Sequence, residues 1–103
     1  MSYTVRLTHE ALQDLQRLED FLVETALAHG DLDLPERALA AIRAEFSILQ
    51  RNPFTCRIAF DDRLERELVI PFGAAGYVAL FHIVSHSEVV ISAIRHQRED
   101  DYH

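Results

Sequence analysis

Apolar and polar residues alternate at the start of the chain, and this alternation predicts a short strand over residues 2–7. Tyr3, Val5 and Leu7 occupy every second position, and polar residues separate them. Because the side chains of a strand point alternately to its two faces, this strand is expected to bury only one face.

The pattern then changes to helical spacing and predicts a helix that begins after Thr8 and stops at His29 and Gly30. Threonine is a favourable N-cap, and glycine is the usual residue just past a helix end. One face of the predicted helix is apolar and the opposite face is polar. The apolar positions are Ala11, Leu12, Leu15, Leu18, Leu22 and Ala26, flanked by Phe21, and the polar positions are Gln13, Asp14, Gln16, Arg17, Glu19, Asp20 and Glu24.

A second amphipathic helix is predicted from Asp33 to Arg51. Asp33 suits the cap, Pro35 suits the first turn, and Glu36 suits the capping-box position. Pro53 ends the helix because proline disfavours helical geometry at the residue before it. The apolar positions are Leu39, Ile42, Phe46 and Leu49. Since the link between the two helices is short, we expect an antiparallel helical hairpin.

From residue 54 onward, short apolar runs predict strands. Residues 57–60 form a weak strand or a loop, and residues 65–70 form a second candidate. The runs 77–84 and 89–94 are too continuously apolar for half-exposed strands, so we expect them at the centre of a sheet covered by helices. The order is strand, helix, helix and three antiparallel strands. It predicts one α+β domain over residues 1–103, with the sheet packed against the helical hairpin.

Composition indicates a globular protein and limits its partners. The chain has 103 residues, of which 49% are hydrophobic, and its formal net charge is −7 although all ten of its basic residues are arginine. Nonspecific phosphate binding needs an excess of positive charge, and no segment clusters bases as a groove-reading element does. We therefore expect no direct DNA contact by this chain. One cysteine and no long apolar run favour a cytoplasmic protein without a membrane span.

Functional side chains concentrate near the C-terminus. The segment 95–102, which we call the tail, is first basic, then acidic, then aromatic. Its candidate functional residues are Arg95, His96, Arg98 and Tyr102. Elsewhere the chemistry is sparse. His82 and His86 have no third ligand at a suitable spacing, so neither a metal nor another cofactor is expected. Cys56 has no neighbouring base in the sequence, so it is not expected to act as a nucleophile.

The ordered set of segments resembles the RelE/ParE superfamily of bacterial type II toxins. The matching segments are residues 3–8 leading into Ala11, Asp14 and Leu15, residues 66–68 and 71–73, residues 76–81, and residues 93–102. The resemblance runs along nearly the whole chain. It implies the small toxin fold, a cognate antitoxin as partner, and growth arrest when the antitoxin is lost.

The superfamily contains proteins with two different activities, and the functional residues of the two groups differ. RelE-like members are ribosome-dependent mRNA endonucleases, whereas ParE-like members inhibit DNA gyrase. A metal-free nuclease needs a base, a cation and an acid around the scissile phosphate. Here Val78 stands where an active nuclease typically has arginine, and residues 67–70 lack lysines that would grip RNA. The ParE-like branch is therefore favoured, with gyrase as the target. Arg95, His96, Arg98 and Tyr102 are then target-binding residues, and a catalytic activity is not favoured.

Two alternatives stay open. The first is a ribosome-dependent mRNA endonuclease with Arg66, His96 and Tyr102 as catalytic candidates, because nuclease relatives place catalytic groups at the positions of His96 and Tyr102. The second is a member that has lost its toxicity and only binds its antitoxin. The tail residues also have structural interpretations: Arg95 pairs with Glu99, Asp100 or Asp101, His96 forms hydrogen bonds at the surface, and the Tyr102 ring packs on the sheet.

Overall fold

The computed structural model describes residues 2–99 and residue 102 of the chain. The elements are β1 (Thr4–Leu7), α1 (His9–His29), α2 (Leu34–Arg51), the 3₁₀ turn η1 (Pro53–Thr55), β2 (Arg57–Ala59), β3 (Asp62–Phe72), β4 (Ala75–Ser85) and β5 (Glu88–His96). The α+β class and the element order are confirmed. The weak candidate at residues 57–60 is the short strand β2, which adds a fifth strand to the sheet.

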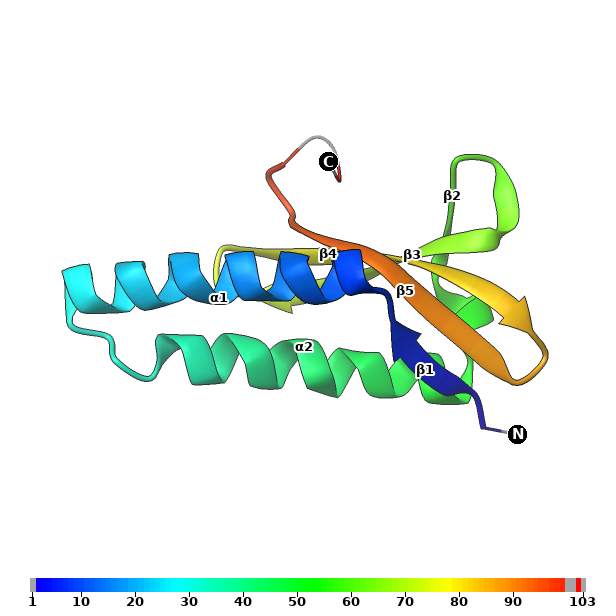
Figure 1. Ribbon diagram of the computed structural model, residues 1–103, viewed down its shortest axis with the longest axis horizontal. Helices are drawn as coiled ribbons and strands as arrows, with labels where there is room; N and C mark the ends of the chain where they lie inside the picture. The colour runs from blue at the N-terminus through cyan, green and yellow to red at the C-terminus, as the bar shows by residue number, and fades with distance from the viewer. Residues whose placement is uncertain (1, 100–101, 103) are drawn as a thin grey trace.

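The five strands form one mixed sheet in the order β1-β5-β4-β3-β2. β1 pairs with β5 in parallel, and the other neighbours are antiparallel. The two helices lie side by side, and the loop between them stands beyond the end of the sheet (Figure 1). Neither helix has an apolar stretch long enough to cross a membrane.

The main core lies between the helical hairpin and one face of the sheet, which we call the helix face. α1 and α2 bury their stripes against alternate residues of the long strands, as the spacing predicts. The buried members are Ala11, Leu18, Leu22, Ala38, Ile42, Leu49, Leu68, Ile70, Tyr77, Ala79, Phe81, Ile83, Val89, Ile91 and Ile94. Each large side chain in this set contributes about 1.5–3 kcal/mol through burial.

Asp14 corrects the predicted polar face of α1. Its side chain is buried, with 5% of the residue exposed, whereas Leu12 from the predicted apolar face is 54% exposed. The backbone N–H of Ile94 donates to the Asp14 carboxylate at 2.9 Å. The ladder between β1 and β5 ends at Leu7 and Ile91, so Ile94 lies beyond the reach of β1. The Asp14 carboxylate therefore accepts the hydrogen bond that a longer β1 would have accepted.

The ends of the helices follow the sequence with one exception. The Thr8 hydroxyl accepts a hydrogen bond from the Ala11 N–H at 3.1 Å, and Gly30 adopts the left-handed conformation with φ of 74°. Asp33 lies at the N-cap of α2, but its side chain caps no backbone N–H. Instead it forms an ion pair with Arg37. The predicted capping box is therefore absent.

The turn between β3 and β4 is short. The two strands are joined by residues 73 and 74 alone, and Pro71 pairs with Gly76 within the ladder. Gly76 has φ of 149°, and a Cβ atom at this position would lie 2.1 Å from the backbone oxygen of Ile70. Only glycine fits at this position because the backbone of the neighbouring strand occupies the space of a side chain.

The turn between β2 and β3 is strained. Ala59 pairs with Asp62, so the turn consists of Phe60 and Asp61, whose φ angles are 55° and 61°. A two-residue hairpin turn with two positive φ angles favours Asn-Gly, and a bulky side chain is unfavourable there. Phe60 is nevertheless present and 71% exposed. Phe60 thus combines a solvent-exposed aromatic ring with an unfavourable positive φ angle.

Replacing Phe60 and Asp61 by Asn and Gly is expected to raise the free energy of unfolding by about 1–3 kcal/mol, because backbone strain is relieved and little burial is lost. Urea denaturation measures the change. Phe60→Val is the matched control, since it also removes the ring but places a β-branched residue at positive φ. Stabilisation by both replacements would show that the exposed ring, and not the backbone, is the unfavourable feature.

Candidate functional site

Residues 97–99 continue from β5 on the side of the sheet away from α2 (Figure 1), and Tyr102 packs against that side. We call this surface the open face. It carries a small apolar cluster of Ala59, Val78, Leu80, Ala93 and Tyr102. Val78 is fully buried within this cluster, and Tyr102 is 8% exposed. The position at which the resemblance expects arginine in a nuclease is thus an apolar residue in a closed cluster.

Tyr102 is held by hydrogen bonding as well as by packing. Its hydroxyl donates to a carboxylate oxygen of Glu67, and the other oxygen of Glu67 accepts from Nε of Arg57 at 2.9 Å. Burial raises the pKa of the Tyr102 hydroxyl, and the neighbouring Glu67 carboxylate raises it further. A phenol with a raised pKa stays protonated at neutral pH, so this group is poorly suited to act as a general base.

Arg95 shapes the start of the tail. Its Nη1 donates to the backbone oxygens of His96 and Gln97 at 3.3 Å and of Glu99 at 2.6 Å. Its guanidinium lies 4.9 Å from the centre of the Tyr102 ring, and its side chain is 13% exposed. Arg95 therefore binds the tail of its own chain. Of its three predicted acidic partners, Asp100 and Asp101 lie outside the described residues.

Arg66 is separated from Tyr102 by the sheet. Arg66 and Glu67 are consecutive in β3, so their side chains leave opposite faces, and Glu67 contacts Tyr102 on the open face. The Arg66 guanidinium donates to the backbone oxygens of Phe54 and Cys56 at 2.9 Å. Arg66 thus stabilises η1 and the residue before β2, and it lies away from His96 and Tyr102.

His96 and Arg98 are placed differently, at a hollow of about 490 Å³ between the tail and α1. We call it the tail hollow. Its lining residues are Arg17, Leu18, Phe21, His96, Arg98 and Glu99. The Arg98 N–H donates to Nδ1 of His96 at 3.1 Å. In the neutral ring the proton is then on Nε2, which makes His96 a hydrogen-bond donor at that atom.

The tail hollow combines charge with an apolar anchor. Arg17 forms an ion pair with Glu99 at 3.2 Å, which fixes the tail against α1. Phe21 is 63% exposed at its edge. Because Arg17 is already paired with Glu99, the Arg98 side chain, the imidazole donor and the exposed ring remain to bind an acidic or carbonyl-rich protein segment. Sequence reasoning noted Phe21 only as a flank of the helical stripe and gave no signal for Arg17.

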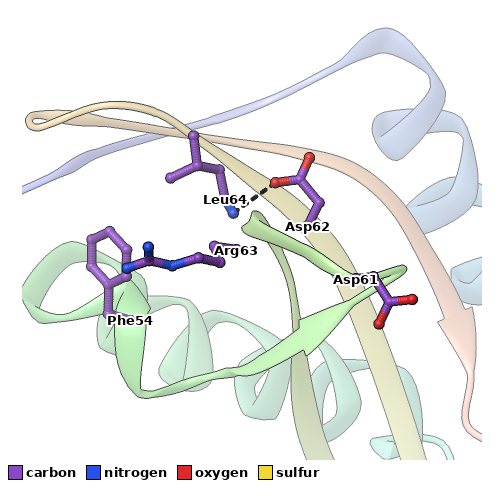
Figure 2. A pocket seen from close by; sticks show the side chains of 5 residues that line it. All are labelled: Phe54, Asp61, Asp62, Arg63 and Leu64. Carbon is purple, nitrogen blue, oxygen red and sulfur yellow. Dashed lines mark hydrogen bonds between the residues drawn. The ribbon is translucent and has the colours of Figure 1, made fainter.

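A second hollow, of about 600 Å³, lies at the strained turn. It is lined by Phe54, Asp61, Asp62, Arg63 and Leu64. Figure 2 shows Arg63 extended toward Phe54, while the carboxylates of Asp61 and Asp62 point in different directions. Exposed apolar side chains gather on the same elements, namely Phe54, Ile58, Phe60 and Leu64. Such a gathering marks a surface suited to a protein partner.

The comparison with known families decides the identity. A family model described as "ParE toxin of type II toxin-antitoxin system, parDE" matches residues 5–101. The chain belongs to the ParE toxin family. It is therefore a toxin of the type II toxin–antitoxin class, and membership of the family implies an antitoxin partner. A search of curated proteins finds no match.

Family membership confirms the RelE/ParE resemblance and the fold that it implies. In this ParE-family toxin the predicted tail residues separate into two groups. Arg95 and Tyr102 contact each other on the open face, whereas His96 and Arg98 line the tail hollow. Glu67, which sequence reasoning did not select, joins the first group to β3.

In this toxin, Tyr102→Phe is expected to lower the free energy of unfolding by about 1–2 kcal/mol at pH 7, because the ring still packs but a hydrogen bond to a carboxylate is lost. Since the pKa of Tyr102 is raised above its ordinary value near 10, the unfolded chain ionises first. The stabilisation is therefore complete below about pH 10 and is lost as the pH rises further. Urea denaturation at several pH values measures it.

A double-mutant cycle with Glu67→Ala serves as the control. Because both changes remove the same hydrogen bond, their effects should fall short of additivity by about 0.5 kcal/mol or more. Additive effects, or a difference between wild type and Tyr102→Phe that persists unchanged above pH 10, would contradict the assigned contact.

Proposed function

We propose that this ParE-family toxin arrests growth by inhibiting DNA gyrase, through a protein contact made at the tail hollow, and that its cognate antitoxin neutralises it. One observation carries the proposal. The open-face position where nuclease relatives place arginine is Val78, which is fully buried. An apolar side chain thus stands where an RNA-cleaving site places a cation, and Arg95, which lies opposite Val78 in β5, is bound to backbone oxygens of its own chain.

The distribution of the other chemical groups supports the same function. Arg66, Arg95 and Tyr102 are bound to groups of their own chain, and Arg66 lies on the face away from Tyr102. His96 and Arg98 are left at the tail hollow beside the exposed Phe21. A net charge of −7 is unfavourable for gripping RNA but compatible with a protein target. Gyrase as that target places the proposed action in the cytoplasm.

The antitoxin is proposed to dock on the helical hairpin. Phe21 is 63% exposed, and Leu27 and Leu32 near the loop between the helices are each 70% exposed. An amphipathic helix of the antitoxin would bury these side chains in the way that helices commonly fill apolar surfaces. Because Phe21 also borders the tail hollow, an antitoxin bound there would compete with the target for the same surface.

The test is a DNA gyrase supercoiling assay with the purified toxin, with and without antitoxin, in which trapped cleavage product is also scored. The wild-type toxin is expected to inhibit, and the antitoxin to reverse the inhibition. A double variant, His96→Ala with Arg98→Ala, should raise the concentration for half-inhibition about tenfold or more, the usual effect of removing interface anchors. Arg51→Ala, at the exposed end of α2, is the matched control and should inhibit normally.

Full supercoiling by gyrase in the presence of a protein that arrests growth would overturn the proposal. Translating ribosomes would then be the next target to assay, with mRNA cleavage as the readout and His96→Ala as the deciding variant. A protein that causes no growth arrest when expressed alone, yet binds its antitoxin, would instead be a member that has lost its toxicity.

A further inference from the structure

A second group of chemical side chains lies on the open face, away from the tail. It consists of Asp62, Glu65 and His82, whose potential ligand atoms all lie within 4.8 Å of one another. Nε2 of His82 and a carboxylate oxygen of Glu65 are 2.9 Å apart. Sequence reasoning found no third ligand for His82 and expected no metal, because these residues are separated along the chain and only strand pairing joins them.

The fold brings the three residues together through two features. Glu65 of β3 lies directly opposite His82 of β4, so their side chains leave the same face of the sheet as neighbours. Asp62 is the first residue of β3, immediately after the strained turn, where the register between β2 and β3 shifts. This shift places the Asp62 carboxylate next to the pair formed by Glu65 and His82.

The local charge suits a divalent cation. Two carboxylates and an imidazole converge, and the neighbouring Arg63 extends away toward Phe54 (Figure 2). The Leu64 N–H donates to Oδ1 of Asp62 at 2.9 Å, which orients the carboxylate and leaves Oδ2 as a ligand atom. Glu65 and His82 have side chains that are 18% and 43% exposed, so an ion can reach them from solvent.

We propose that Asp62, Glu65 and His82 form a zinc-binding site. Zinc is bound by imidazole nitrogen and carboxylate oxygen at about 2.0–2.2 Å, which separates neighbouring ligands of a tetrahedral ion by roughly 3.0–3.5 Å. The Glu65–His82 separation of 2.9 Å is close to that value, and the exposed Asp62 completes the set with a small side-chain movement. A water molecule takes the fourth position. A nitrogen ligand favours zinc over magnesium, which prefers oxygen alone.

A bound zinc ion would join the strained β2–β3 turn to β4. Asp62 stands at the turn, and His82 belongs to a strand in the centre of the sheet. The ion would therefore stabilise the folded chain and restrain the exposed surface around Phe60. This inference does not depend on gyrase as the target, because it concerns metal affinity and stability alone.

The test measures zinc binding to the metal-free toxin by competition with a chromophoric chelator, with cobalt as a spectroscopic probe. Wild type is expected to bind one ion per chain and to gain thermal stability in zinc. His82→Ala and Glu65→Gln should each weaken binding more than about tenfold and remove the thermal shift. His86→Ala is the matched control, since His86 is exposed in the turn between β4 and β5, and should behave as wild type.

Far-ultraviolet circular dichroism checks that each variant is folded, and Asp62→Asn provides a third ligand variant outside the centre of the sheet. The proposal is overturned if wild type binds no stoichiometric zinc. It is equally overturned if His82→Ala retains wild-type affinity or if His86→Ala loses it, because the ion would then sit at other surface histidines.

Discussion

The hydrogen bond from the Ile94 N–H to the buried Asp14 carboxylate is the contact on which the arrangement of this toxin depends. β5 continues past the end of β1, and a buried backbone N–H without a partner costs about 1–3 kcal/mol. The carboxylate from α1 removes that cost and fixes the helix along the edge of β5. β5 ends two residues later at His96, so the same contact sets α1 and its exposed Phe21 beside the tail hollow.

The two faces of the sheet are stabilised by different forces. The helix face is a conventional apolar core, formed with both helices. The open face carries a small apolar cluster, and the Tyr102 ring covers it. Glu67 is central there, because it accepts from Tyr102 and from Arg57. A carboxylate with two donors is a stronger tie than an isolated surface ion pair, which contributes about 0–1 kcal/mol.

This division explains which residues remain for function. A tail rich in arginine, histidine and tyrosine resembles a catalytic segment, yet Arg95 and Tyr102 bind their own chain. His96 and Arg98 line a hollow, and the strained turn holds Phe60 in solvent. An unfavourable backbone conformation at Phe60 and Asp61 supports the hypothesis that the surface around this turn is functional. The toxin thus presents two separate surfaces, the tail hollow and the exposed Phe60 ring with its neighbours, and the first of them is the one that we propose for the target.

The sequence by itself determined the elements and the family. Apolar spacing defined both helices and the central strands, Thr8 and Gly30 set the limits of α1, and the ordered segments identified the superfamily, because these signals are local or follow chain order. The tertiary structure decided the rest. It buried Asp14, placed Arg66 on the face opposite Tyr102, and brought Glu65 to His82. Strand register and the end of a neighbouring strand create these contacts, and no spacing along the chain encodes either of them.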